Sequence, residues 1–119
     1  MKFGLAPIQS KPTFERMLDQ ARLAEDLGFA ELFAHEHHSE AMLYPDPLMA
    51  LAAMATAIER IRLGTNMLLL PIHHPVRVTQ EAAMVDVLSG GRLDLGVANG
   101  STTAGATHTQ SWASATSPA

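Results

Sequence analysis

The chain has no cysteine among its 119 residues, which excludes disulfides, thiolate metal sites and cysteine nucleophiles. Its apolar runs, such as Met67–Leu70, are far shorter than the ~20 residues that a membrane-spanning helix needs. It also lacks a basic cluster that could neutralise nucleic-acid phosphates or bind an anionic membrane, and its net charge is −4. Residues 1–7 show no secretory signal. We therefore expect a cytoplasmic protein without nucleic-acid or membrane partners.

The composition is that of a packed domain. Hydrophobic residues make up 47% of the sequence and charged residues 17%, so a sizeable core can be buried. A chain of this length forms one domain at most, or part of a larger one.

Apolar segments alternate with helical signals along the chain. The segments expected to be strands are Lys2–Pro7, Ala30–Ala34, Arg62–Leu70 and Leu93–Val97. The expected helices follow Thr13, run from Asp46 to Ile58, and run from His74 to Ser89, each beginning at a residue suited to a cap or a first turn. The expected buried side of the third helix is formed by Val78, Met84, Val87 and Leu88. Strands joined by helices imply a parallel sheet, so the predicted fold class is α/β.

The most informative segment is Glu31–His38, ELFAHEHH, where a buried strand runs into three histidines and a carboxylate. The C-terminal ends of parallel strands usually carry the chemistry of such folds. Histidine changes protonation near neutral pH, so His37 could transfer protons or bind a metal. Glu36 could orient an imidazole or be a structural, buried carboxylate.

Two interpretations of the neighbouring histidines differ in geometry. If the strand geometry continues, we expect His35 and His38 to point away from His37, because side chains alternate along a strand. If a metal is bound, His35 and His37 share one strand face as two ligands. A third ligand is not identifiable, although His73 could contribute; His73 is otherwise expected to lie in its loop.

Several motifs in a fixed order resemble a known family. They are Glu36-His37-His38, the Gly64-Thr65 strand followed by Pro71, His74-Pro75-Val76-Arg77, and Asp86 with Leu88–Arg92. Together they resemble the N-terminal half of the bacterial luciferase-like flavin-dependent monooxygenases. That superfamily also includes F420-dependent oxidoreductases. The resemblance covers about residues 1–100.

The resemblance implies a (β/α)8 TIM barrel with flavin at the C-terminal ends of its strands. A complete barrel typically needs ~250 residues, so residues 1–100 would be a truncated first half with about four strands. An open half barrel exposes two sheet edges. We therefore expect self-association and little flavin-dependent activity from the chain alone.

The resemblance also implies roles for particular residues. His37 matches the family's acid/base histidine near the reduced flavin, and Asn66-Met67 lies where the family often has a non-prolyl cis peptide against the flavin ring. The implied cofactor-binding set is Glu36, Asn66, Met67, Ala98 and Asn99. Many relatives have arginine at the position of Asn99, and asparagine lacks the charge that meets a flavin phosphate. Arg77 and Arg92 also match family positions, and we expect structural salt bridges from both.

The implied reaction is oxygenation of an organic small molecule by O2 and a reduced flavin, either FMN or F420, with a flavin reductase as a partner. Three alternatives stay open: an F420-dependent oxidoreductase, a non-catalytic half-barrel fragment, and a metal-dependent hydrolase.

The last segment, residues 101–119, differs in composition from the rest. It contains no Asp, Glu, Lys or Arg and consists mostly of Ser, Thr and Ala. We expect a disordered, low-complexity tail. A second hypothesis is a reading-frame shift near residue 101, because codons can be chosen for this segment whose neighbouring frame encodes a charged, helix-like continuation.

Overall fold

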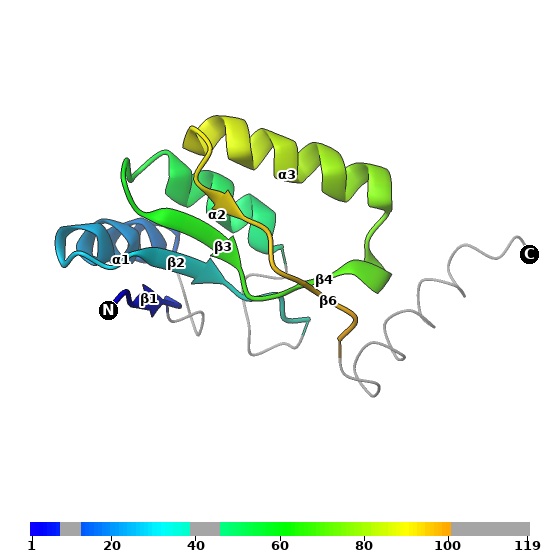
Figure 1. Ribbon diagram of the computed structural model, residues 1–119, viewed down its shortest axis with the longest axis horizontal. Coiled ribbons are helices and arrows are strands. Elements are labelled where there is room, and N and C mark those ends of the chain that lie inside the picture. Colours follow the sequence, from blue (N-terminus) through cyan, green and yellow to red (C-terminus); the bar gives the residue numbers. More distant parts are fainter. Residues whose placement is uncertain (8–12, 39–45, 101–119) are drawn as a thin grey trace, which may run out of the picture.

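The computed structural model describes residues 1–7, 13–38 and 46–100. Strands and helices alternate along them, as the sequence predicts (Figure 1). The helices are α1 (Phe14–Asp26), α2 (Pro47–Ala55), the 3-10 turn η1 (Leu70–Ile72) and α3 (Pro75–Ser89). The strands are β1 (Gly4–Leu5), β2 (Glu31–Ala34), β3 (Arg62–Thr65), β4 (Leu68–Leu69), β5 (Leu93–Asp94) and β6 (Val97–Ala98). The tail and its frame-shift hypothesis fall on residues 101–119, outside the described residues.

The sheet is parallel throughout, which confirms the α/β prediction. Its strand order is β1-β2-β3-β5, and β4 pairs with β6 in a second parallel ladder. The register places Leu5, Leu32, Leu63 and Leu93 side by side across four strands. Leu32 and Leu63, in the middle of this row, are fully buried.

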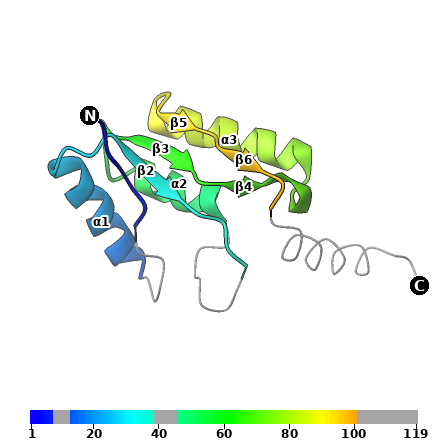
Figure 2. The ribbon, with the colours of Figure 1, turned by 60° about the horizontal axis from the view of Figure 1, so that its bottom comes forward.

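The three α-helices cover one face of the sheet, and none of the described helices covers the other (Figure 2). The core therefore lies between the leucine row and the helices. Its buried apolar side chains come chiefly from α1 and α2. They include Met17, Ala21, Leu48, Leu51 and Met54, with Ile61 just before β3.

The predicted helix starts are confirmed by their capping bonds. The Thr13 hydroxyl accepts a hydrogen bond from the Arg16 amide at 3.2 Å, and the Asp46 carboxylate accepts one from the Met49 amide at 3.0 Å. His74 caps α3 through its ring Nδ1. These side chains satisfy amides that the first helical turn leaves unpaired.

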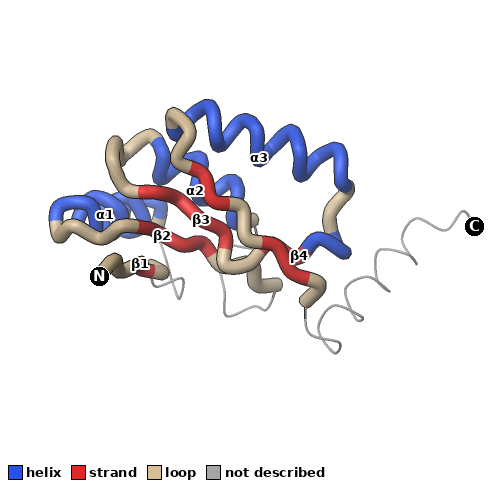
Figure 3. Tube along the Cα trace, viewed as in Figure 1, coloured by secondary structure: helices blue, strands red, loops and turns tan. Residues whose placement is uncertain are grey.

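The strands expected over residues 62–70 and 93–97 are each broken near the C-terminal edge of the sheet (Figure 3). The strand predicted over residues 62–70 stops at Thr65 and resumes at Leu68, and the next strand breaks between Asp94 and Val97. The Thr65 hydroxyl donates to the Gly96 carbonyl at 2.7 Å, and a Cβ on Gly96 would collide with the Thr65 carbonyl. Glycine thus permits a close approach at which both strands bend.

The prediction that α2 continues to Ile58 is wrong, and so is the predicted salt bridge of Arg92. The helix ends at Ala55, and the Arg92 guanidinium donates to the Ile58 and Ile61 carbonyls, both at 2.8 Å. Arg92 therefore binds the carbonyls of the turn between α2 and β3. Arg77 does form the predicted kind of contact, an ion pair with Glu81 at 2.9 Å.

The predicted buried side of α3 is only partly correct. Val78 is buried, but Met84, Val87 and Leu88 are at least half exposed. The side that contacts α2 and the sheet instead carries Val78, Val85 and Ser89, which are spaced so that they share one helix face. Apolar residues lie on two sides of this helix, and sequence spacing alone does not tell which one is covered.

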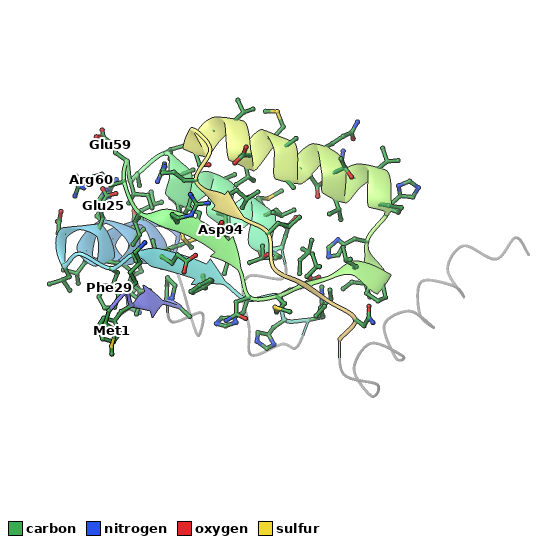
Figure 4. All side chains as sticks on the ribbon, in the orientation of Figure 1. Met1, Glu25, Phe29, Glu59, Arg60 and Asp94 are labelled. Carbon is green, nitrogen blue, oxygen red and sulfur yellow. The ribbon has the colours of Figure 1, made fainter. Side chains whose placement is uncertain are left out.

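Glu25, in the last turn of α1, holds the loop that leads into β3 (Figure 4). Its carboxylate accepts hydrogen bonds from the backbone amides of Glu59, Arg60 and Ile61, at 3.0, 2.6 and 3.0 Å. Burial opposes ionisation of Glu25, but these three donors and the charge of Arg60 outweigh it, so the pKa of Glu25 lies below its usual value. An ionised Glu25 therefore stabilises the entry to β3.

Candidate functional site

The segments that follow β2 and β3 meet at the C-terminal edge of the sheet. The His35 ring Nδ1 and the Asn66 carbonyl form a hydrogen bond across 31 positions of sequence. The peptide bond that follows, Asn66-Met67, is cis, as the family resemblance implied. Both residues are exposed at the strand ends.

Glu36 lies on the opposite side of the same segment and is buried, with 5% of the residue exposed. One carboxylate oxygen accepts a hydrogen bond from the Leu69 amide at 2.6 Å. The other accepts from the Nε2 atoms of His38 and His73, each at 2.7 Å. These donors compensate for the removal of the carboxylate from water. The Glu36 side chain is therefore enclosed, and its predicted contact with a cofactor stays a prediction.

His37 lies next to these contacts but is itself exposed. Its ring centroid is 6.0 Å from that of His35, and the two rings are inclined by 42°. The expectation that His35 points away from His37 is therefore wrong, because residues two apart on an extended segment share a face. His38 lies with Glu36 on the other face.

An open hollow continues from this edge along the uncovered face of the sheet. It has a volume of about 480 Å³ and is lined by Phe33, Thr65, Asn66, Met67, Asp94, Leu95 and Gly96. The Phe33 ring lies across the neighbouring strands, where Gly4 and Gly64 leave room for it. A Cβ on Gly64 would come within 2.9 Å of two ring carbons. The Phe33 ring thus forms one wall of the hollow.

Charged side chains from three adjacent strands, β2, β3 and β5, interact on this face. Arg62 binds Asp94 through two nitrogens, with Nη2 and Oδ1 at 2.6 Å. Its hydrogen bond lowers the pKa of Asp94 against the opposing effect of burial. Burial and a hydrogen bond with Asp94 raise the pKa of Glu31. The three groups form a compensated cluster. At the edge of the sheet, His37 is exposed and its ring lies near that of His35.

Ala98 and Asn99 reach the same edge from β6. Ala98 pairs with Leu69 in the β4–β6 ladder, and the exposed Asn99 follows it. The sheet thus places the predicted site residues on one edge, but direct contacts join only some of them. The contacts of His73 and of the Leu69 amide with Glu36 were missed by sequence reasoning, because nothing in the spacing relates positions 33 and 37 residues apart.

The described residues include no group of three or more His, Cys, Asp or Glu side chains arranged to hold a metal ion. His38 and His73 each form a hydrogen bond with Glu36. No described helix is long and apolar enough to cross a membrane. The edge of the sheet presents the exposed imidazole of His37, the exposed residues Asn66 and Met67, and the hollow lined by Phe33.

A family model described as luciferase-like monooxygenase matches residues 1–115. The chain belongs to this family. The oxygenase component of the flavin-dependent trigonelline monooxygenase of Acinetobacter baylyi is 34% identical over 91 residues, which cover 76% of this chain and 25% of that protein. The family resemblance of the sequence is thus confirmed, and the match extends beyond residue 100.

Solved structures agree on the fold. The monooxygenase RslO1 from Streptomyces bottropensis is 38% identical with a TM-score of 0.75, over 82% of this chain and 32% of that one. The oxygenating constituent of 3,6-diketocamphane monooxygenase from Pseudomonas putida, in complex with FMN, has a TM-score of 0.79 at 24% identity. The match covers 91% of this chain and 32% of that one. The F420-dependent tetrahydromethanopterin reductase of Methanopyrus kandleri has a TM-score of 0.69 at 23% identity, covering 87% and 28%.

The chain spans about a quarter to a third of the length of these proteins. Its four-stranded parallel sheet with helices on one face is the first part of a (β/α)8 barrel, which confirms the predicted fold class.

Proposed function

We propose that the chain supplies the His37 side of a flavin site in an enzyme that oxygenates an organic small molecule. The observation that carries this proposal is the contact between His35 and Asn66, which brings the segment bearing His37 to the exposed residues Asn66 and Met67. In luciferase-like folds of this kind, the C-terminal strand ends are where reactions take place.

In this proposal His37 is the acid/base group. It is exposed at the strand ends, and an imidazole can exchange a proton near neutral pH. Asn66 and Met67 would contact the flavin ring, while Ala98 and Asn99 would approach it from β6. Glu36 would act only through its neighbours, since its side chain is enclosed.

The cofactor, when bound, would supply the redox chemistry. Reduced flavin would give two electrons, one oxygen atom of O2 would enter the substrate, and the other would leave as water. A flavin reductase would restore the reduced cofactor. We propose FMN as the cofactor and the cytoplasm as the location, and F420 serves as the competing ligand in the test below.

We also propose that the barrel portion ends near residue 100 and that 101–119 form a separate tail. The composition of the tail, with its lack of charged residues, supports this division.

Stopped-flow mixing of photoreduced FMN with oxygenated buffer tests the proposed role of His37. We expect the chain to alter the reoxidation time course of the flavin, with a pH dependence that His37→Ala removes. The control His74→Asn keeps an N-cap residue on α3 and should behave as the native chain.

Titration of the chain with FMN and with F420 sets the concentrations for this assay and decides between the two cofactors. Identical reoxidation with and without chain, at concentrations where titration shows FMN bound, would refute the proposed role. Saturable binding of F420 but not of FMN would overturn the choice of cofactor.

A further inference from the structure

Glu36 is the only charged residue in the described part of the chain that belongs to the buried core; its side chain has no exposed area. A buried carboxylate is costly unless its oxygens receive hydrogen bonds. Here Leu69 donates to one oxygen, and His38 and His73 donate to the other. Two of these three donors belong to β4 and the residue that follows η1. These hydrogen bonds therefore join the segment after β2 to β4 and to the residue after η1, in addition to compensating the buried charge.

The segment bearing His37 is held on both of its faces. On one face His35 binds the Asn66 carbonyl, and on the other Glu36 binds Leu69 and His73. His37 lies between these attachments in the sequence. Any change in the Glu36 contacts must therefore alter how firmly the backbone of His37 is held against the Asn66-Met67 peptide.

His73 and His74 are adjacent but have different partners. His74 caps α3 by accepting from the Val76 amide at 3.3 Å, whereas the His73 ring reaches back to Glu36 and is only 23% exposed. The two residues thus offer a matched pair of substitutions at one place in the chain.

We propose that Glu36 and His73 are positioning residues that fix the segment bearing His37 against β4 and the Asn66-Met67 peptide. The attachment itself does not depend on the proposed function, but its effect on flavin chemistry rests on that function. His38 completes the cluster through its own bond to Glu36. None of the three touches the reacting groups; they act through the backbone that carries His37.

Amide hydrogen exchange followed by mass spectrometry tests the attachment without any flavin. We expect His73→Leu and Glu36→Gln to speed exchange of the Leu69 amide, which donates to Glu36, by roughly tenfold or more. His73→Leu removes a donor from the buried carboxylate, and Glu36→Gln offers the Leu69 amide a weaker acceptor. His73→Gln keeps an N–H donor and should restore most of the protection. His74→Asn should leave it unchanged. Exchange in α1 reports whether a variant has lost its overall fold.

The second arm measures the pH profile of FMN reoxidation in the same variants. A residue that only stabilises the fold would leave the profile of the folded fraction unchanged. We expect His73→Leu to flatten the profile towards that of His37→Ala, and His73→Gln to recover it.

The outcomes separate the two proposals. If His73→Leu leaves exchange of the Leu69 amide unchanged, or if His73→Gln fails to restore protection, the positioning inference is overturned. If the exchange changes as expected but the native chain has no effect on flavin reoxidation, the attachment stands and the proposed function falls. If exchange changes as expected and the native chain alters flavin reoxidation, but the pH profile of His73→Leu matches that of the native chain, the positioning role is overturned and Glu36 and His73 are structural only.

Discussion

Glu36 and His73 are 37 positions apart in sequence, yet the carboxylate Oε1 and the imidazole Nε2 lie 2.7 Å apart in the fold. The contact joins the end of β2 to the turn after β4. Short hydrogen bonds between a carboxylate and an imidazole are among the stronger polar contacts in proteins. It therefore sets the geometry of the sheet edge on which the proposed site depends.

Arg92 should be far more important for stability than Arg77. Arg92→Lys is expected to lower the free energy of unfolding by about 1–3 kcal/mol, because lysine cannot donate to the Ile58 and Ile61 carbonyls together. Arg77→Lys is the matched control. Its side chain is 71% exposed and forms one surface ion pair, so a change of about 0.5 kcal/mol or less is expected. Urea unfolding measures both. Equal effects would contradict this account of Arg92.

Glu25→Gln should destabilise the chain by about 1–3 kcal/mol near neutral pH, since the amide is a weaker acceptor for the three backbone donors of residues 59–61. The pKa of Glu25 is lowered in the folded state. Its stabilising contribution is therefore complete above the unfolded value, 4.5, and is lost as pH falls through the folded value.

The difference in the free energy of unfolding between the native chain and Glu25→Gln should consequently shrink as the pH falls below the pKa of an unfolded glutamate. Chemical unfolding at several pH values measures this difference. A gap that widens with acid would show that the donors do not favour the ionised form.

Gly64→Ala should destabilise by about 1–3 kcal/mol, because the new methyl group would lie 2.9 Å from the Phe33 ring. Phe33→Leu shortens the side chain at that point. The cost of Gly64→Ala should therefore be smaller in a Phe33→Leu background, and a double-mutant cycle measures this coupling. Independent effects would mean that the ring does not occupy the space above Gly64.

These predictions also show where sequence reasoning succeeds. The caps at Thr13, Asp46 and His74 were predictable because a cap involves residues two or three positions apart. The parallel sheet followed from alternating strands and helices. The break after Thr65 was not predictable from local pattern, because it depends on the approach of Gly96 from the neighbouring strand.

Side-chain partners were harder to predict than elements. The sequence marks Glu36 and three neighbouring histidines as unusual, but the partner of Glu36 after η1 follows only from the fold. The resemblance to luciferase-like enzymes supplied the cis Asn66-Met67 bond, which no local signal indicates. Local chemistry therefore predicted the elements, and the fold was needed to assign the contacts.

The uncovered sheet face should cause the chain to associate with itself. Among the described strands, β1 and β5 each pair with one neighbour, and Leu95 in the hollow is 42% exposed. Unpaired edges and apolar faces favour association. Leu95→Lys should weaken association. Leu23 lies on α1 and is 58% exposed, so Leu23→Lys is the matched control and should leave association unchanged. Sedimentation over a range of concentrations measures both. A monomer at every concentration would contradict this expectation.

The most direct test of the central claim is an amide chemical-shift map of the isotope-labelled chain titrated with FMN. If the C-terminal strand ends form part of a flavin site, the shifts should saturate and cluster at residues 35–38, 66–69 and 98–100. Binding is expected to be weak, because the chain spans only about a quarter to a third of its relatives. Shifts confined to the groove between α2 and α3, lined by Met49, Met84 and Leu88, or no saturable shift at all, would contradict the claim.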